Sequence, residues 1–252
     1  WVGYLEDCKR TPFPDHCDEK PHVGVRVSPP DINRSDADFT VVFEKNEPRD
    51  SLHGHVRFGI GAIKGVSTSA IQAIIRERAE HGSFESLFDF CERVDLKAVN
   101  RATIEALVKC GAFDSIHGTE ARSALVASID DATRSGQAAA DDRLSGQMNF
   151  FDSFKATEES TPEKTPAVLR TTEPWSVLET LKQEKEVLGF HVSGHPLDLH
   201  RESLRAFCSH NAAQAAEADH DTPLVLGGML TRVRTMLTKA GRDQRVRDLL
   251  CN

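Results

Sequence analysis

Apolar residues recur every three or four positions through the middle of the chain, which is the spacing of one face of an α-helix. The first such stretch lies between an N-cap at Ser67 or Thr68 and a stop at Gly82. The apolar face of this predicted helix is formed by Ala70, Ile71, Ile74 and Ile75.

Four further helices follow the same pattern. A short one carries Leu87, Phe88 and Cys91, and the next begins at an Asn100 cap, buries Ile104, Leu107 and Val108, and ends at Gly111. Another follows Thr119, presents Leu125, Val126 and Ile129, and is expected to end near Gly136. The last begins at a capping box of Ser176 and Glu179, presents Leu178, Leu181 and Leu188, and ends at Gly189.

Strand and turn signals flank the helices. "SPPDIN" at 28–33 is a rigid turn because its two prolines fix φ. "DFTVVFE" at 38–44 is rich in β-branched residues and is expected to pair with "HVRFGI" at 55–60. Residues 223–242 hold two strand-like runs, fewer than a closed barrel needs. The pattern as a whole predicts an α+β fold that is mainly α-helical.

Residues 134–174 lose this periodicity. Ser, Thr, Glu, Pro and Ala dominate, and they bury too little apolar surface to offset the entropy of ordering, so we expect a flexible linker over 137–174. One apolar island, "GQMNFF" at 146–151, stands inside it. Exposed Met148, Phe150 and Phe151 indicate a docking peptide. The alternative is that the island folds back onto the preceding helix.

Composition and charge exclude several classes of protein. The 252 residues carry a net charge of −8, so the chain is not a nucleic-acid polycation. The six cysteines are scattered without a C-x-x-C pair, which favours a reducing, cytoplasmic protein over a disulfide framework or zinc ribbon. No apolar run is long enough for a membrane span, and no signal peptide is expected. Because the chain begins abruptly at Trp1, we expect a piece of something longer.

The segment "GAIKGVSTSAIQAII" has the shape of a helix-hairpin-helix element: a short helix, an apolar-Gly-apolar turn, and a second helix. Gly65 has no Cβ, so the turn can approach a phosphate, and the first N–H groups of the following helix point toward it. The candidate DNA-binding residues in this turn are Lys64, Gly65, Val66, Ser67 and Thr68.

"KCGAFDSI" at 109–116 repeats the turn, so Lys109, Gly111 and Ala112 are candidates for a second hairpin of a tandem pair. Across residues 59–111, seven Lys or Arg face seven Asp or Glu, so amide donors rather than a basic field would bind the phosphates. The alternative interpretation of these residues is a plain helical bundle with glycine C-caps.

The C-terminal stretch has a different charge. Between 226 and 247 the basic residues outnumber Asp243, the only acidic residue there. Basic strands of this kind suit a groove for single-stranded nucleic acid, with Arg232, Arg234, Lys239 and Arg242 as candidate contacts. The alternative is a solvated strand face.

No catalytic or metal site is predicted. His191 and His195 are four residues apart, but Gly194 and Pro196 would break the helix needed to aim both rings at one metal. Cys8, His16, Cys17 and His22 have irregular spacing. Ser193 lacks an acidic group to orient a neighbouring histidine, so it is not part of a triad.

The order of these pieces is more specific than any one of them. "SPPDINRSDADFTV", "VRFGIGAIKGVSTSAIQAII", "SFESLFDFCERVDLKAVNRATIEALVKCGAFDSI", "GQMNFF", "EKEVLGFHVSGHPLDLH" and "LGGMLTRVRTMLTKAGR" follow one another, and the chain from residue 1 to about 242 closely resembles the alpha subunit of bacterial replicative DNA polymerase III.

The resemblance implies five segments: the end of a fingers domain (1–57), a tandem helix-hairpin-helix region (58–136), a linker with a clamp-binding peptide (137–174), a helical segment (175–205) and a truncated OB-fold start (206–252). It also implies duplex DNA, a sliding clamp and other replicase subunits as partners, no membrane, and Mg²⁺ as the cofactor of the parent polymerase but of no site in this chain. The clamp-binding residues it implies are Gln147, Met148, Phe150 and Phe151.

Three departures from the family pattern stand out. Ser67 takes the place of the second glycine of the first hairpin, residues 11–25 look like an insertion, and "DQRVRDLLCN" after Arg242 does not continue the expected barrel strands. The family's catalytic aspartates lie upstream of residue 1, so this chain is expected to be inactive alone. The rival interpretations are a stand-alone helix-hairpin-helix repair or nuclease-associated protein and a histidine-dependent metal hydrolase.

Overall fold

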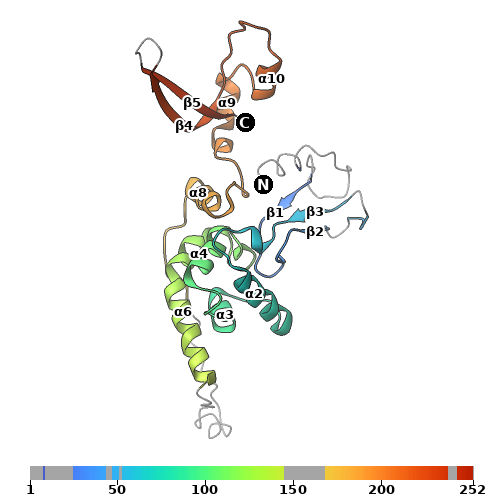
Figure 1. The fold of residues 1–252 in the computed structure, drawn as a ribbon, viewed down its shortest axis with the longest axis vertical. Helices are drawn as coiled ribbons and strands as arrows, with labels where there is room; N and C mark the ends of the chain where they lie inside the picture. The colour runs from blue at the N-terminus through green and yellow to red at the C-terminus, as the bar shows by residue number, and fades with distance from the viewer. Residues whose placement is uncertain are drawn as a thin grey trace. The chain divides into compact units, whose positions relative to one another are not determined.

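The structure is a computed structural model that describes residues 8, 25–43, 47–50, 53–144, 168–237 and 243–251 (Figure 1). The chain separates into two compact units, Trp1–Ser193 and Gly194–Asn252.

A small mixed sheet precedes the helices of the first unit. It contains β1 (Val27–Ser28), β2 (Thr40–Val42) and β3 (His55–Arg57), in the order β1-β3-β2. β2 is antiparallel to β3, with Val41 opposite Val56, so the predicted pairing of 38–44 with 55–60 is confirmed. β1 is parallel to β3, with Val27 opposite Val56, and this strand was not predicted. The fold is therefore mainly helical with a three-stranded mixed sheet.

The helices of the first unit begin where short polar side chains cap them. They are η1 (Ile60–Ala62), α2 (Thr68–His81), α3 (Leu87–Arg93), α4 (Arg101–Lys109), α5 (Asp114–His117), η2 (Thr119–Ala121), α6 (Arg122–Leu144) and α8 (Val177–Leu188). Ser67 accepts from the Ala70 N–H at 3.2 Å, and Asn100 accepts from the Thr103 N–H at 3.0 Å. The Ser176 hydroxyl accepts from the Glu179 N–H at 3.2 Å. The predicted starts of these three helices are confirmed.

One hydrophobic core joins the strands to the helices. Phe90 of α3 lies at its centre, with its ring 4.9 Å from that of Phe84 and 5.2 Å from that of Phe113, both edge to face. Phe58, directly after β3, is also fully buried. Each such ring contributes about 1.5–3 kcal/mol of burial free energy, so the core holds the hairpin turns on a rigid support.

The expected helix end near Gly136 is wrong, because α6 continues to Leu144. A side chain at Gly136 would collide with the carbonyl oxygen of Cys91 in α3. The glycine is therefore a crossing point at which the two helices approach closely, rather than a C-terminal stop. The predicted start of the linker at residue 137 falls inside this helix.

The predicted apolar face of α8 is wrong at its first position. Leu178 is 52% exposed, whereas Leu181, Val187 and Leu188 are buried. Gly189 ends the helix in the left-handed conformation, at φ +88°, as predicted. Burial is concentrated toward the C-terminal end of α8, so its first turn is left exposed.

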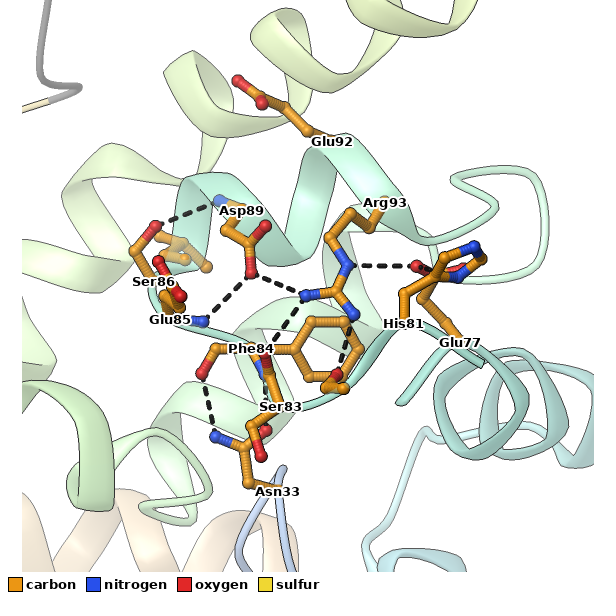
Figure 2. A network of polar contacts seen from close by, with 12 residues as sticks. Asn33, Glu77, His81, Ser83, Phe84, Glu85, Ser86, Asp89, Glu92 and Arg93 are labelled. Carbon is orange, nitrogen blue, oxygen red and sulfur yellow. Dashed lines mark hydrogen bonds and ion pairs between the residues drawn. The ribbon is translucent and has the colours of Figure 1, made fainter. Parts of the chain in front are cut away.

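Arg93 ties the turn between α2 and α3 together (Figure 2). Its guanidinium contacts Glu77 at 3.0 Å and Asp89 at 3.0 Å, donates to the carbonyl oxygens of residues 82 and 83, and lies 4.6 Å from the Phe84 ring centroid. The Asn33 side chain bonds both the N–H and the carbonyl of Phe84, at 2.8 and 2.9 Å. Arg93 is thus committed to the fold.

The second unit contains short helices and one hairpin. These are η3 (Pro196–His200), α9 (Arg201–Phe207), α10 (Ala212–Glu217), β4 (Gly228–Leu237) and β5 (Asp243–Cys251). β4 and β5 are antiparallel, with Gly228 opposite Cys251 and Leu237 opposite Asp243.

Two strand predictions are corrected here. The segment after Arg242 forms β5, although it was expected to end the strand pattern, because it pairs along the whole of β4. The described part of this stretch, residues 223–237, holds one strand rather than two. None of the described helices has the length and apolar character required to cross a bilayer.

Candidate nucleic-acid interface

The first hairpin has the geometry that the sequence predicted. η1 leads into an exposed turn at Gly65, whose φ is +84°, and Ser67 then caps α2. A Cβ at Gly65 would have no protein atom within 4 Å, so the glycine leaves open space above the turn. Ile63, only 2% exposed, anchors the turn in the core. An exposed left-handed turn on a fixed support suits close approach by a phosphate.

Backbone donors at this turn are not used inside the protein. Within the described residues, the N–H groups of Gly65, Ser67, Thr68 and Ser69 donate to no protein acceptor, whereas those of Ala70 and Ile71 are bonded to Ser67. Lys64 and Val66, the other two candidates, use their N–H groups internally, to the carbonyl oxygens of Val187 at 2.9 Å and Ile63 at 3.4 Å. The helix dipole adds attraction for an anion at this end.

The start of α4 lies against the same turn. The Thr103 hydroxyl donates to the Gly65 carbonyl at 3.4 Å. Within the part of the chain that the structure describes, the N–H groups of Arg101 and Ala102 also donate to no acceptor. Residues 100–102 were not among the predicted DNA contacts, because no local spacing in the sequence indicates that two helix starts meet in space. Two positive helix ends therefore border the Gly65 turn.

Gly111 and Ala112 do not form a second turn of this kind. Gly111 has φ +84°, but both residues are buried, and their N–H groups bond the carbonyl oxygens of Val108 at 3.0 Å and Leu107 at 2.9 Å. These bonds close the C-terminus of α4. The geometry leaves neither N–H available to a phosphate.

A buried ion network packs against Gly111. The Arg122 side chain, 1% exposed, bonds Asp114 at 2.9 and 2.5 Å and Glu184 at 2.9 Å. Glu184 also accepts from the N–H groups of Val192 and Ser193, at 3.0 Å each, and from the Ser193 hydroxyl. A side chain at Gly111 would collide with Arg122, so substitution there would disturb this network first.

The network holds Glu184 ionised. Burial by itself raises the pKa of its carboxyl group, but the hydrogen bonds from Ser193, Arg122 and Val192 outweigh burial, and its pKa lies below the ordinary value. The Ser193 hydroxyl therefore donates to the Glu184 carboxylate and is not positioned as a nucleophile.

Lys109 is held by two carboxylates. Its ammonium is 3.0 Å from Glu105 and 3.3 Å from Glu186, and its side chain is 15% exposed. Burial lowers and the two carboxylates raise the pKa of this lysine, which ends above its ordinary value. Lys109 is charged but already paired.

The remaining predicted contacts are those of the clamp-binding peptide and of the C-terminal strands. The clamp-binding residues Gln147, Met148, Phe150 and Phe151 lie outside the described residues, as do Lys239 and Arg242. Arg232 and Arg234 lie on β4 opposite Asp248 and Val246.

The two basic positions of β5 are not on the same face of the hairpin as Arg232 and Arg234. Arg245 and Arg247 lie opposite Thr235 and Val233, so strand alternation places these positions on the other face of the hairpin from Arg232 and Arg234. The register does not gather the basic positions on one face.

The histidines have structural contacts. His191 Nδ1 is 2.9 Å from the Leu181 carbonyl oxygen, and His195 caps η3 by accepting from the Leu197 N–H at 3.2 Å. Among the described residues, no group of three or more His, Cys, Asp or Glu lies close enough together to hold a metal ion. This arrangement does not support the metal-hydrolase interpretation.

Comparisons with known proteins agree with this geometry. Residues 24–124 match the model of the helix-hairpin-helix motif family. The chain is 35% identical over 240 residues to the DNA polymerase III subunit alpha of Vibrio cholerae and 34% identical over 240 residues to that of Haemophilus influenzae. Each match covers 95% of this chain and 18% of the relative.

A third relative, the same subunit of Neisseria meningitidis, is 36% identical over 219 residues, which is 87% of this chain and 17% of the relative. The chain thus spans less than a fifth of the length of the curated relatives that it matches. It is homologous to a segment of the bacterial DNA polymerase III alpha subunit that contains a helix-hairpin-helix motif.

Proposed function

We propose that this chain is the part of a replicative DNA polymerase that holds duplex primer–template DNA, and that it does so through the Gly65 turn and the adjoining start of α4. The observation that carries the proposal is the group of N–H donors at residues 65, 67, 68, 69, 101 and 102, which have no acceptor within the described residues. Donors of this kind bind phosphate oxygens and carry no base information, so binding is independent of sequence.

The cations of this region support an amide-based rather than a charge-based interface. Arg78 bonds the carbonyl oxygens of Ile32 and Ser35, and Arg101 pairs with Asp130 and Glu105. Arg78, Arg93 and Arg101 are thus already bonded within the protein. Few basic side chains of this region remain to contact DNA phosphates and release their counterions. Affinity should therefore be weak and should depend on salt less steeply than in a polycationic binder.

The same proposal assigns no chemical step to this chain. The parent activity is template-directed nucleotidyl transfer with Mg²⁺, and the carboxylates of its metal site belong to the family's palm domain. The described residues offer no cluster that fits Mg²⁺. The assignments of 1–57 to the fingers and of 206–252 to an OB-type barrel remain predictions from the resemblance.

We further propose that "QMNFF" docks on the sliding clamp. Phe150 and Phe151 would fill an apolar pocket, while the Gln147 amide fixes orientation. The test is titration of a purified bacterial sliding clamp with a peptide spanning residues 144–154 and with a control in which both phenylalanines are alanine. Only the first peptide should bind; equal binding by both, or none by either, contradicts the proposal.

The test of duplex binding is a matched pair of glycine variants. Gly65→Val and Gly82→Val both place a β-branched residue at a positive φ, +84° and +82°, where an added Cβ meets nothing within 4 Å. Gly82 has ψ −175°, a combination with positive φ that only glycine adopts readily, so the control variant carries backbone strain of its own, but only residue 65 lies at the proposed phosphate site. Binding of a fluorescent 20-base-pair duplex is measured by anisotropy, with two unrelated sequences.

Gly65→Val should lose at least about tenfold in affinity for both sequences, because the valine keeps the phosphate from the N–H groups, while Gly82→Val should bind as the unaltered chain does. Circular dichroism checks that both variants keep their helices. If Gly65→Val binds normally, the turn is only a bundle connection. If the two variants lose affinity equally, the loss reports strain and not a contact with DNA.

A further inference from the structure

The C-terminal end of α8 contacts the lysines of both predicted hairpins. The ammonium of Lys64 is 3.5 Å from the carbonyl oxygen of Glu186, and the ammonium of Lys109 is 3.3 Å from its carboxylate. The backbone N–H of Lys64 donates to Val187 at 2.9 Å. One short stretch of α8 therefore contacts both lysines, and one of them, Lys64, directly precedes the Gly65 turn.

Two carboxylates contact Lys109. Its ammonium lies between Glu105, at 3.0 Å, and Glu186, at 3.3 Å, and Glu105 is shared with Arg101, at 2.9 Å. The negative end of the α8 dipole lies at the same place and adds to them. A phosphate that approached Lys109 would have to compete with a carboxylate already in contact.

Glu186 differs from the other groups that bind these lysines. Its side chain is 59% exposed, whereas Glu105 is 28% exposed and also pairs with Arg101 on the same helix. An exposed pair of this kind contributes little to stability, so the fold does not require it. The Glu186 carboxylate instead changes the electrostatic potential that a DNA phosphate would encounter at this surface.

We propose that Glu186 is an internal counter-ion that occupies Lys109 and so removes one phosphate contact from the duplex interface. This inference rests on the proposed function, because it concerns the same DNA-binding surface. Its consequence is that the grip on DNA comes from the N–H groups at the Gly65 turn, which suits a protein that must move along any sequence. When Glu186 is neutral, Lys109 should be able to contact a DNA phosphate, a contact that is absent in the unaltered chain.

The experiment compares Glu186→Gln with Glu179→Gln in the 252-residue chain. Both changes raise the net charge by one on the same helix, but Glu179 forms its ion pair with Lys182 and acts on Lys109 only through its longer-range charge. Duplex affinity is measured between 50 and 300 mM NaCl by anisotropy. The same pair of changes is repeated in a Lys109→Gln background.

Glu186→Gln should bind about three- to tenfold more tightly at 50 mM salt, with a slope of log K against log salt more negative by about 0.9, the value for one added phosphate contact. Glu179→Gln should change the slope little, and the gain should vanish when Lys109 is glutamine. Binding by Glu186→Gln where the unaltered chain shows none would also support the proposal.

Three results would overturn it. Slopes that coincide for the unaltered chain and Glu186→Gln show that Glu186 withholds no contact, and the proposed function still stands if Gly65→Val has lost binding. Equal gains from Glu186→Gln and Glu179→Gln show a general charge effect. If no variant binds duplex DNA even at 50 mM salt, this inference and the proposed function both fail.

Discussion

The buried pair of Arg122 and Glu184 predicts a large loss of stability when one partner is neutralised. Glu184→Gln keeps the shape of the side chain, so no cavity forms, but it removes the charge that faces a guanidinium only 1% exposed. Breaking a buried ion pair costs about 3–5 kcal/mol. Because Asp114 continues to bond Arg122 at 2.9 and 2.5 Å, we expect the lower end, about 3 kcal/mol.

This magnitude is large enough to measure and small enough to leave the chain folded. A domain of 150–250 residues shifts its melting temperature by about 2–4 °C per kcal/mol, so Glu184→Gln should melt about 6–12 °C lower. Thermal and urea unfolding are followed by circular dichroism and by tryptophan fluorescence, to which Trp175, two residues before α8, contributes. The control is Glu179→Gln, an exposed pair on the same helix, which should change stability by less than about 1 kcal/mol.

The pH dependence adds a second readout with a defined sign. Folding lowers the pKa of Glu184, so its contribution to stability is present above the unfolded pKa, about 4.3, and is lost as the pH falls through the folded value. The difference in stability between the unaltered chain and Glu184→Gln should therefore shrink in acid.

A double variant decides whether the charge pair itself matters. In an Arg122→Met background, Glu184→Gln should cost less than in the unaltered chain, because the guanidinium that its charge faces is already absent. A Glu184→Gln chain as stable as the Glu179→Gln control, at every pH, would refute the reasoning.

Three further predictions concern the crossing of α3 and α6, the thiols and catalysis. Gly136→Ala should destabilise the chain by about 1–3 kcal/mol in urea unfolding, because its methyl group would meet the Cys91 carbonyl; unchanged stability would show that the crossing is loose. Burial raises the pKa of Cys91 and of Cys110 to about 12, so both thiols should react with Ellman's reagent at pH 8 only after denaturant is added, whereas rapid reaction in the folded chain would contradict their burial. Primer extension with Mg²⁺ and dNTPs should stay at background, and template-dependent synthesis by this chain would overturn its assignment as a non-catalytic segment.

The sequence by itself determined the features that act over a few residues. Ser67, Asn100 and Ser176 cap helices because each side chain reaches an N–H three positions ahead, and such a contact needs nothing from the rest of the fold. The Gly65 turn belongs to the same class, since an exposed left-handed residue requires only a missing Cβ. The pairing of β2 with β3 followed from a β-branched run at 38–44 and a second strand-like run close to it in sequence.

Tertiary structure decided what the same local signals were used for. Gly65 and Gly111 have the same φ, +84°, yet one lies in open space and the other against Arg122, because the approach of α6 and α8 fills the second site. Gly136 looked like a helix stop and serves a helix crossing. The start of α4 meets the Gly65 turn through Thr103, a contact between residues 38 positions apart. Such contacts depend on how the core packs, and no short-range pattern in the chain encodes them.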